Sequence, residues 1–286
     1  MRRKRIKMGY LNSDEREAEL IRLLQLLIKV VEINTGKPIP NNDKRLFDAE
    51  GLAIKYFTHA LSFLQLYRGT TIPELKANFF DPSSANVVAR AALESFLVFH
   101  DIFLSTNAPD EKDLKHTAWV LYGLLERSKS PGFSPEAKKV IIESREKAES
   151  LRNKLKNNPV FCALSEESKK KILKGREWRL HTWREMTVAA GLSEIHANTF
   201  YKFLCGHAHA SNISVTQIHQ AQTAQDQRSI CGATLNVMNI STANMIFAYA
   251  EVFPESRRIL ESEANAAERA RFWIRMGSTP VKGGEN

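Results

Sequence analysis

Two short stretches of the sequence hold the side chains best suited to chemistry. In the first, Arg90 and Glu94 stand four residues apart, where a guanidinium and a carboxylate on one helix can pair. The second, residues 201–211, contains His207 and His209. Because a buried ion pair is costly without further hydrogen bonds, we expect the second stretch to supply partners for the first.

The two histidines leave three interpretations of this cluster open. In a helix His207 and His209 point to opposite sides, whereas in an extended segment they point to the same side, and Gly206 allows a helix to end here. The cluster is a structural pair that fixes helix register, a catalytic or ligand site, or a metal site. A metal site would need a further ligand beside Glu94 and the histidines, so we expect no metal and no cofactor.

The positive charge of the chain points to an acidic partner such as RNA or another nucleic acid. Lys and Arg exceed Asp and Glu by nine, and the pI is near 9.4. Five of the positive charges lie in the first seven residues, MRRKRIK, so the alternative is an ordinary solvated basic terminus. The candidate nucleic-acid contacts are Arg2, Arg3, Lys4, Arg5, Lys169, Lys170, Lys171 and Arg179.

The elements that must position these residues are helices. Residues 81–104 are apolar on nearly every face of a helix, which is typical of a buried helix, and Asp81 followed by Pro82 is a strong helix start. We therefore expect a central helix whose polar stripe faces residues 198–211. The side chains of this stripe are Asn86, Arg90, Glu94 and Asp101.

The rest of the chain predicts an all-α fold. No segment shows the sustained alternation of β-branched residues between tight turns that indicates strands. We expect a single compact multi-helix bundle of about nine to eleven helices over residues 13–276. A basic tail, 1–12, precedes it and a second tail, 277–286, follows it. Within the domain, residues 134–176 are dense in charge and can project as a helical arm.

The cysteines and the longest uncharged run bear on location. Cys162, Cys205 and Cys231 are odd in number, far apart and without a CxxC spacing, which fits a reducing cytoplasm. Residues 229–250 carry no charge and are long enough to cross a bilayer. Their asparagine, serine and threonine side chains make the segment too polar for a lone lipid-facing span, so we expect a buried helix and no membrane partner.

The common catalytic and nucleotide-binding signatures are missing from the sequence. It contains no GxxxxGK[ST], no GxGxxG after a strand, no HExxH and no GxSxG. Their absence argues against most familiar enzyme classes.

The chain resembles an uncharacterised bacterial family of helical domains. In that family an R-A-x-x-E helix precedes a Tyr-containing helix that ends in a Ser- or Cys-x-x-His turn. Residues 90–94, Arg-Ala-Ala-Leu-Glu, and the segment from Tyr201 to Ser211, with Cys205 at the small-residue position, carry this pattern. The resemblance covers residues 44–252 and implies a helical architecture without a settled activity.

A second resemblance is to helical ribonuclease toxins and defence nucleases, which use an Arg followed after four to six residues by a His. Arg176 and His181 match that spacing, in basic surroundings. In such an enzyme the histidine acts as acid and base on the ribose 2′-hydroxyl while the arginine stabilises the phosphorane charge, without a metal. Trp178 and Trp183 can stack bases or pack in a core.

We interpret the chain as a nucleic-acid-associated helical protein of the cytoplasm, with a metal-independent ribonuclease of toxin or defence type as the sharper form of this hypothesis. The alternative is a non-enzymatic interaction or regulatory module whose Arg/Glu/His cluster is structural. An enzyme should place its histidines with arginine at an open cleft, whereas a scaffold should bury them. A homodimer through exposed helices is a further expectation.

Overall fold

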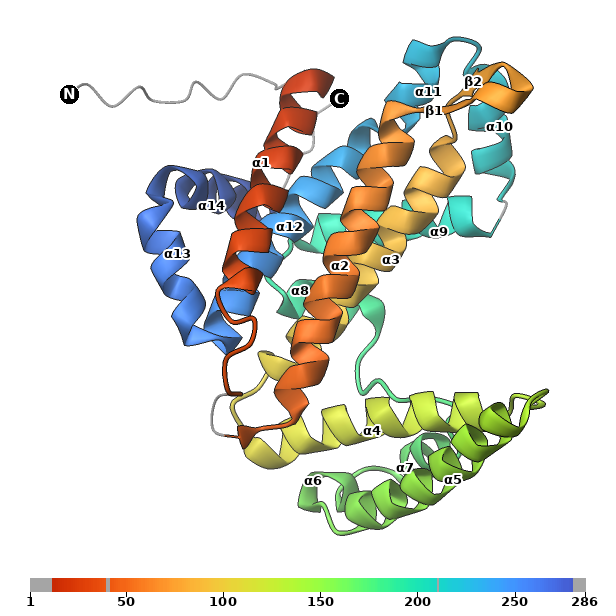
Figure 1. Ribbon diagram of the computed structural model, residues 1–286, viewed down its shortest axis with the longest axis vertical. Helices are drawn as coiled ribbons and strands as arrows, with labels where there is room; N and C mark the ends of the chain where they lie inside the picture. Colours follow the sequence, from red (N-terminus) through yellow and green to blue (C-terminus); the bar gives the residue numbers. More distant parts are fainter. Residues whose placement is uncertain (1–11, 40–41, 210, 280–286) are drawn as a thin grey trace. The chain divides into compact units, whose positions relative to one another are not determined.

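The chain folds into two compact units (Figure 1). The computed structural model describes residues 12–39, 42–209 and 211–279. Unit 1 combines two separate stretches, residues 1–98 and 190–286, and unit 2 is the continuous stretch 99–189. The predicted domain therefore comprises both units, and the predicted charged arm, 134–176, lies within unit 2.

The all-α prediction is confirmed, because the described residues form helices with one small hairpin and two 3-10 turns. The helix α3 (Pro82–Phe103) begins in unit 1 and ends in unit 2. The remaining elements of unit 1 are α1 (Ser13–Glu32), α2 (Arg45–Arg68), β1 (Thr70–Ile72), η2 (Pro73–Leu75), β2 (Ala77–Phe79), α9 (Glu194–Ala208), α10 (Asn212–Gln220), α11 (Ala224–Ile230), α12 (Gly232–Val252), η3 (Pro254–Ser256), α13 (Arg257–Ser262) and α14 (Ala264–Ser278). Those of unit 2 are α4 (Pro109–Ser128), α5 (Pro135–Lys156), α6 (Pro159–Cys162), α7 (Glu166–Leu173) and α8 (Trp183–Ala189).

The predicted number of nine to eleven helices is too low, since the described residues form 14 α-helices. The difference comes from short elements. The chain continues after His209 into α10 and α11, α6 has only four residues, and a kink at Glu263 separates α13 from α14. Hydrophobic periodicity is hard to read over one or two turns, so these helices left little signal in the sequence.

A short hairpin follows α2, although the sequence indicated no strands. Thr70 of β1 pairs with Phe79 of β2, and Ile72 pairs with Ala77. Gly69 has a positive φ of 88°, which lets the chain turn sharply out of α2. Each strand has three residues, too few for alternation to show.

The uncharged run 229–250 supplies α12, the core helix of unit 1. α1 and α14 pack against it, and Figure 1 shows α1 along its side. The backbone of α14 comes very close at Gly277, where an added Cβ would lie 2.5 Å from the Ile240 side chain. Polar groups in this core are satisfied by one another: the Tyr56 hydroxyl of α2 lies 2.8 Å from those of Ser241 and Thr242. Within the described part of the chain, no helix has both the length and the apolar character needed to cross a membrane.

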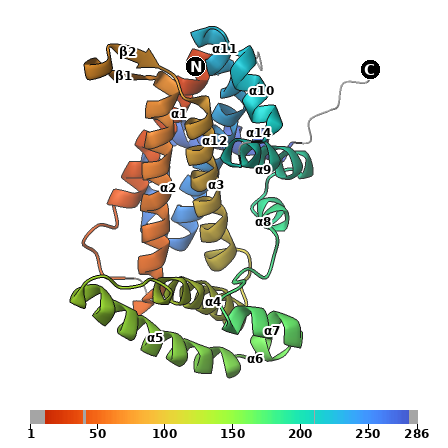
Figure 2. The ribbon, with the colours of Figure 1, turned by 90° about the vertical axis from the view of Figure 1, so that its right-hand side faces the viewer.

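Unit 2 has a core of its own. α4 and α5 lie side by side, with α6 and α7 packed against α4 (Figure 2). Gly175, at a φ of 61°, follows α7 where a Cβ would lie 2.8 Å from Leu125, so the close turn requires glycine. The buried residues of this core are Leu114, Ala118, Leu121, Ala148, Leu155, Phe161 and Ile172.

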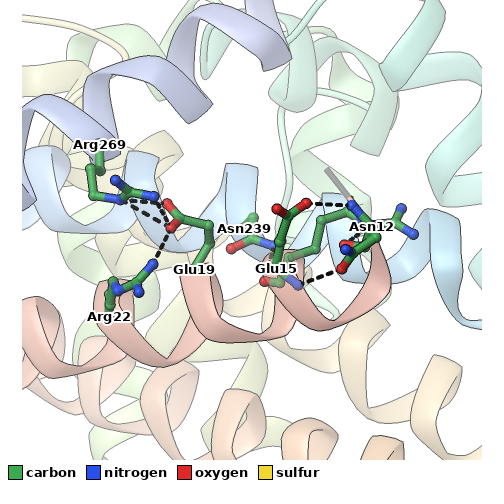
Figure 3. A network of polar contacts seen from close by, with 7 residues as sticks. Asn12, Glu15, Glu19, Arg22, Asn239 and Arg269 are labelled. Atoms are coloured by element: carbon green, nitrogen blue, oxygen red, sulfur yellow. Dashed lines mark hydrogen bonds and ion pairs between the residues drawn. The ribbon is translucent and has the colours of Figure 1, made fainter. Parts of the chain in front are cut away.

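A carboxylate on α1 ties that helix to α14. Glu19 is 3% exposed, and its oxygens accept hydrogen bonds from Arg269 Nε at 2.9 and 3.0 Å and from Arg22 Nη1 at 2.6 Å (Figure 3). Burial would raise the pKa of Glu19, but the hydrogen bonds and charges of the two arginines outweigh burial and lower this pKa. The same helix begins with a capping box between Asn12 and Glu15.

Candidate functional site

The predicted contact between Arg90, Glu94 and the 201–211 segment is present in unit 1. Arg90 Nε donates to Glu94 Oε1 at 2.9 Å within α3, and Arg90 Nη2 donates to the Tyr201 hydroxyl of α9 at 3.1 Å. That hydroxyl in turn donates to Glu94 Oε1 at 3.0 Å. The three side chains therefore close a triangle of hydrogen bonds that joins α3 to α9, and we name them, with His209, the Arg90 cluster.

His209 completes this cluster from the end of α9. Its Nε2 lies 3.3 Å from Arg90 Nη1, and its side chain is exposed. Because a guanidinium only donates, Nε2 of His209 is the acceptor of this bond. The Arg90 guanidinium is consequently shared among a carboxylate, a phenol and an imidazole.

The Arg90 cluster is half-buried, and its electrostatics reflect that position. The side chains of Arg90 and Glu94 are 22% and 28% exposed. Burial, followed by the charge of Glu94, raises the pKa of Tyr201 well above its ordinary value, against the opposing effect of Arg90. Tyr201 is therefore a hydrogen-bond donor and not a phenolate at physiological pH.

His207 faces a different environment from His209. It lies within α9, is 7% exposed, and places Nδ1 3.3 Å from Ser83 Oγ at the start of α3. Burial lowers its pKa, and the Gln217 amide opposes this shift. His207 is thus a neutral packing residue, whereas His209, which caps the helix, reaches Arg90. The helical interpretation of this segment, with its histidines pointing apart, is the one that the structure supports.

The polar side chains along α3 contact three different helices, so they do not form a single site. Asn86 Oδ1 accepts a hydrogen bond from Thr234 of α12. Arg90 and Glu94 face α9. Asp101, at the other end of the helix and within unit 2, pairs with Lys115 of α4 at 3.3 Å, and both of those side chains are 3% exposed. Across the described residues, no group of three or more His, Cys, Asp or Glu side chains is arranged to hold a metal ion.

The second candidate pair, Arg176 and His181, lies in unit 2, and both residues are exposed. In the part of the chain that the structure describes, no hydrogen bond or ion pair joins them. Trp178 packs against the core of unit 2, as the packing interpretation expected. The guanidinium of Arg179 lies 4.7 Å from the Trp183 ring centre and pairs with Glu177 at 3.2 Å.

The predicted basic residues Lys169 and Lys170 line an open pocket of about 540 Å³ in unit 2. The pocket lies where the end of α5 meets α6 and α7, and its lining residues form no recognisable sequence motif. We name it the lysine pocket. Its lining consists of Lys156, Phe161, Cys162, Glu166, Lys169, Lys170, Leu173 and Lys174.

The lysine pocket has an excess of uncompensated positive charge. Lys169 pairs with Glu166 at 2.8 Å. In the described structure the other three lysines of the lining, Lys156, Lys170 and Lys174, are exposed and form no ion pair with a carboxylate. The only aromatic ring of the lining, Phe161, is 3% exposed, so the pocket offers charge and not a stacking surface.

The other predicted basic contacts do not join this pocket. Lys171 points elsewhere on α7 and pairs with Glu167 at 2.7 Å. Arg2, Arg3, Lys4 and Arg5 lie outside the described residues.

The fold and these two sites define the chain as an all-helical protein with a half-buried Arg–Glu–Tyr–His cluster in one unit and a lysine-lined pocket in the other. The model of a family of unknown function (DUF5677) matches residues 59–227, more than half of the chain, and the chain belongs to this family. The matched residues include both sites, and they agree with the predicted resemblance to an uncharacterised domain family. No curated protein and no solved structure matches the chain.

Proposed function

We propose that this protein is nucleic-acid-associated and that the lysine pocket of unit 2 binds the phosphate backbone of single-stranded RNA. The observation that carries the proposal is the pocket itself, in which Lys156, Lys170 and Lys174 converge without a paired carboxylate. Lysines without internal partners can neutralise phosphates, and the cations condensed on the nucleic acid are then released into solution, which drives association. The net charge of +9 supports the same class of partner.

The pocket also sets the kind of recognition that we expect. Phe161 is buried and Trp178 packs against the core, so the lining of the pocket offers bases no exposed ring to stack on. Binding through phosphates alone is insensitive to sequence and strongly sensitive to salt. We therefore propose a backbone-binding protein of the cytoplasm and not a reader of base sequence.

Changing Lys170 and Lys174 together to glutamine is expected to weaken RNA binding about tenfold or more at 100 mM salt. The plot of the logarithm of the binding constant against the logarithm of the salt concentration should also become less steep, by about 1.4. Each lost phosphate contact removes about 0.7 from this slope for a single strand. The measurement is fluorescence anisotropy with a labelled single-stranded RNA across a salt series. The matched control is the pair Lys139→Gln and Lys147→Gln, exposed lysines of α5 outside the pocket. If both double variants lost RNA affinity equally, the overall positive charge and not the lysine pocket would account for binding, and the proposal would be wrong.

The sharper hypothesis, a metal-independent ribonuclease of toxin or defence type, now rests on Arg90 and His209, because they are the arginine and the exposed histidine that are in contact. In that reaction the histidine removes the 2′-hydroxyl proton, the O2′–P bond forms, the P–O5′ bond breaks, and the leaving 5′ oxygen takes up a proton from solvent water. Arg90 stabilises the charge on the phosphorane oxygens. Since Nε2 of His209 accepts a bond from Arg90, a substrate phosphate must first draw the guanidinium away.

The alternative function, a non-enzymatic interaction module, is favoured by one observation on the same residues. Among the described residues, Arg90 bonds to the side chains of Glu94, Tyr201 and His209, and the Tyr201 hydroxyl bridges Arg90 to Glu94. Such a closed set suits a clamp that holds α3 against α9.

Incubation of the protein with a mixed RNA pool in the presence of a metal chelator separates the two functions. For a ribonuclease, His209→Ala should lower the cleavage rate at least about 100-fold, while His181→Ala leaves it unchanged. The variants are compared at equal RNA binding, so that loss of binding is not counted as loss of chemistry. Absence of cleavage by wild-type protein that still binds RNA would rule out the ribonuclease and leave the binding protein.

A further inference from the structure

The outward face of α2 is unusually apolar for an exposed helix surface. Phe47, Ile54 and Leu61 recur every seven residues and are 61%, 49% and 44% exposed. Gly51 and Thr58 lie between them at steps of three and four, so the five residues form one straight seam along the helix. We name these residues the α2 seam.

Two hydroxyls at this seam, those of Thr58 and Ser62, are turned toward the helix backbone. The Thr58 hydroxyl donates to Lys55 O at 3.0 Å, and the Ser62 hydroxyl donates to Thr58 O at 3.0 Å. Both hydroxyls are therefore turned back onto the helix backbone, which leaves carbon atoms toward solvent. Nothing in the described structure lies within 4 Å of a Cβ built on Gly51, so another helix can approach closely there.

We propose that the α2 seam is the contact between two copies of this chain, with the two α2 helices parallel. In a heptad that places Phe47, Ile54 and Leu61 at d and Gly51 and Thr58 at a, Glu50 falls at g and Lys55 at the following e. In a parallel pair, g of one helix meets the next e of the other. Glu50 of each copy therefore faces Lys55 of its partner, which gives two symmetric ion pairs that flank the seam.

The chain after α2 completes the contact. A helix of 24 residues is about 36 Å long and 10–12 Å wide. One face of α2 therefore covers roughly half of the 800 Å² that a standard interface buries on each side. The hairpin that follows, formed by β1, η2 and β2, exposes Leu75 by 70% and Phe79 by 44%. In a parallel pair the two hairpins lie at the same end of the seam, so these side chains extend the buried surface. An antiparallel pair would place the hairpins at opposite ends.

The first test is the oligomeric state of the full chain by sedimentation velocity and light scattering from 1 to 100 μM. The wild type is expected to dimerise in this range, and Ile54→Asp to raise the dimer dissociation constant more than about tenfold. The matched control is Ile142→Asp, an equally exposed isoleucine on α5 in unit 2, which should leave the dimer unchanged. A wild type that stays monomeric at 100 μM, or a dimer that both substitutions affect equally, would overturn the proposal.

A charge swap tests the parallel alignment. Glu50→Lys and Lys55→Glu should each weaken the dimer about fivefold, and the double variant should return to within about twofold of the wild type. Residues five apart on one helix do not face each other, so recovery in the double variant reports a contact between copies. Because Glu50 also lies near Tyr249, the thermal stability of each variant is recorded beside its dimer constant. Failure of the double variant to recover would overturn the parallel alignment.

Cysteine cross-linking gives an independent readout. In a Cys162→Ser background, which removes the exposed native thiol, Ile54→Cys and Leu61→Cys should both form disulfide-linked dimers on mild oxidation. In a parallel pair both positions meet their own copies across the two-fold axis. Cross-linking at position 54 alone would indicate an antiparallel pair and contradict the proposed alignment.

Discussion

Replacing Lys115 by methionine is expected to destabilise unit 2 by about 3–5 kcal/mol, because the change leaves a buried carboxylate without its cation. Lys115 Nζ lies 3.3 Å from Asp101 Oδ1, and it donates to Ser105 Oγ at 2.7 Å. It also pairs with Glu111 at 2.9 Å. Both Asp101 and Lys115 are 3% exposed, so water does not replace the lost ammonium. The measurement is denaturant-dependent hydrogen exchange of the α4 and α5 amides, which follows unit 2 even when the two units unfold separately.

Two further variants show whether burial is the cause. Lys129→Met removes an ion pair on the surface of the same unit, where Lys129 is 61% exposed, and should change stability by less than about 1 kcal/mol. The double variant Asp101→Leu/Lys115→Met removes both charges and should recover most of the loss, since a well-packed apolar pair replaces a buried ion pair at little cost. A double variant as unstable as Lys115→Met alone would contradict this explanation.

Glu19→Gln is expected to destabilise unit 1 by about 1.5–3 kcal/mol at pH 7, because Arg269 and Arg22 lose a charged acceptor that is 3% exposed. The arginines lower the pKa of Glu19 in the folded chain. A lowered carboxyl pKa stabilises the folded state above the unfolded pKa of about 4.3, and this stabilisation is lost as the pH falls through the lower folded value. The advantage of the wild type over Glu19→Gln should therefore be full at pH 6–7 and shrink below pH 4.

The readout is the free energy of unfolding of unit 1 from pH 7 to pH 3 for both proteins. Glu268→Gln on α14 is the control, because Glu268 pairs with Arg275 and Arg271 on the surface and should show no measurable change. A difference between wild type and Glu19→Gln that stays constant down to pH 3 would mean that the carboxylate charge is not what Arg269 and Arg22 need.

The sequence predicted well those features that depend on neighbours in the chain. The spacing of Arg90 and Glu94 indicated their ion pair, because residues four apart on a helix face each other. The helix start at Asp81 was also readable, since a cap is a local bond from a side chain to a backbone amide two or three residues later.

Features that depend on how helices cross were not readable. The stripe from Asn86 to Asp101 is continuous on one helix, but the elements that pass over it differ along its length, so its residues have three separate partners. The lysine pocket combines the last residue of α5 with side chains of α6 and α7, and α6 is too short to be seen in a hydrophobic pattern. The contact of Tyr201 is the exception: its hydroxyl links two residues more than a hundred positions earlier in the chain, and the cost of an unpartnered buried ion pair had indicated partners from residues 201–211.

Because unit 1 is built from two separate stretches of the sequence, it can complete its fold during synthesis only after unit 2 has been made. The apolar face of α1 is buried against later helices and includes Leu20, Leu23 and Leu27. Its main partner, α12, begins about 200 residues downstream and is therefore synthesised much later. At 5–20 residues per second that wait is about 10–40 s. Unit 2 is continuous in sequence and complete by residue 189, so it can fold during the interval. A nascent chain stalled before Gly232 is therefore expected to need a chaperone for its first helix while its inserted unit is already native.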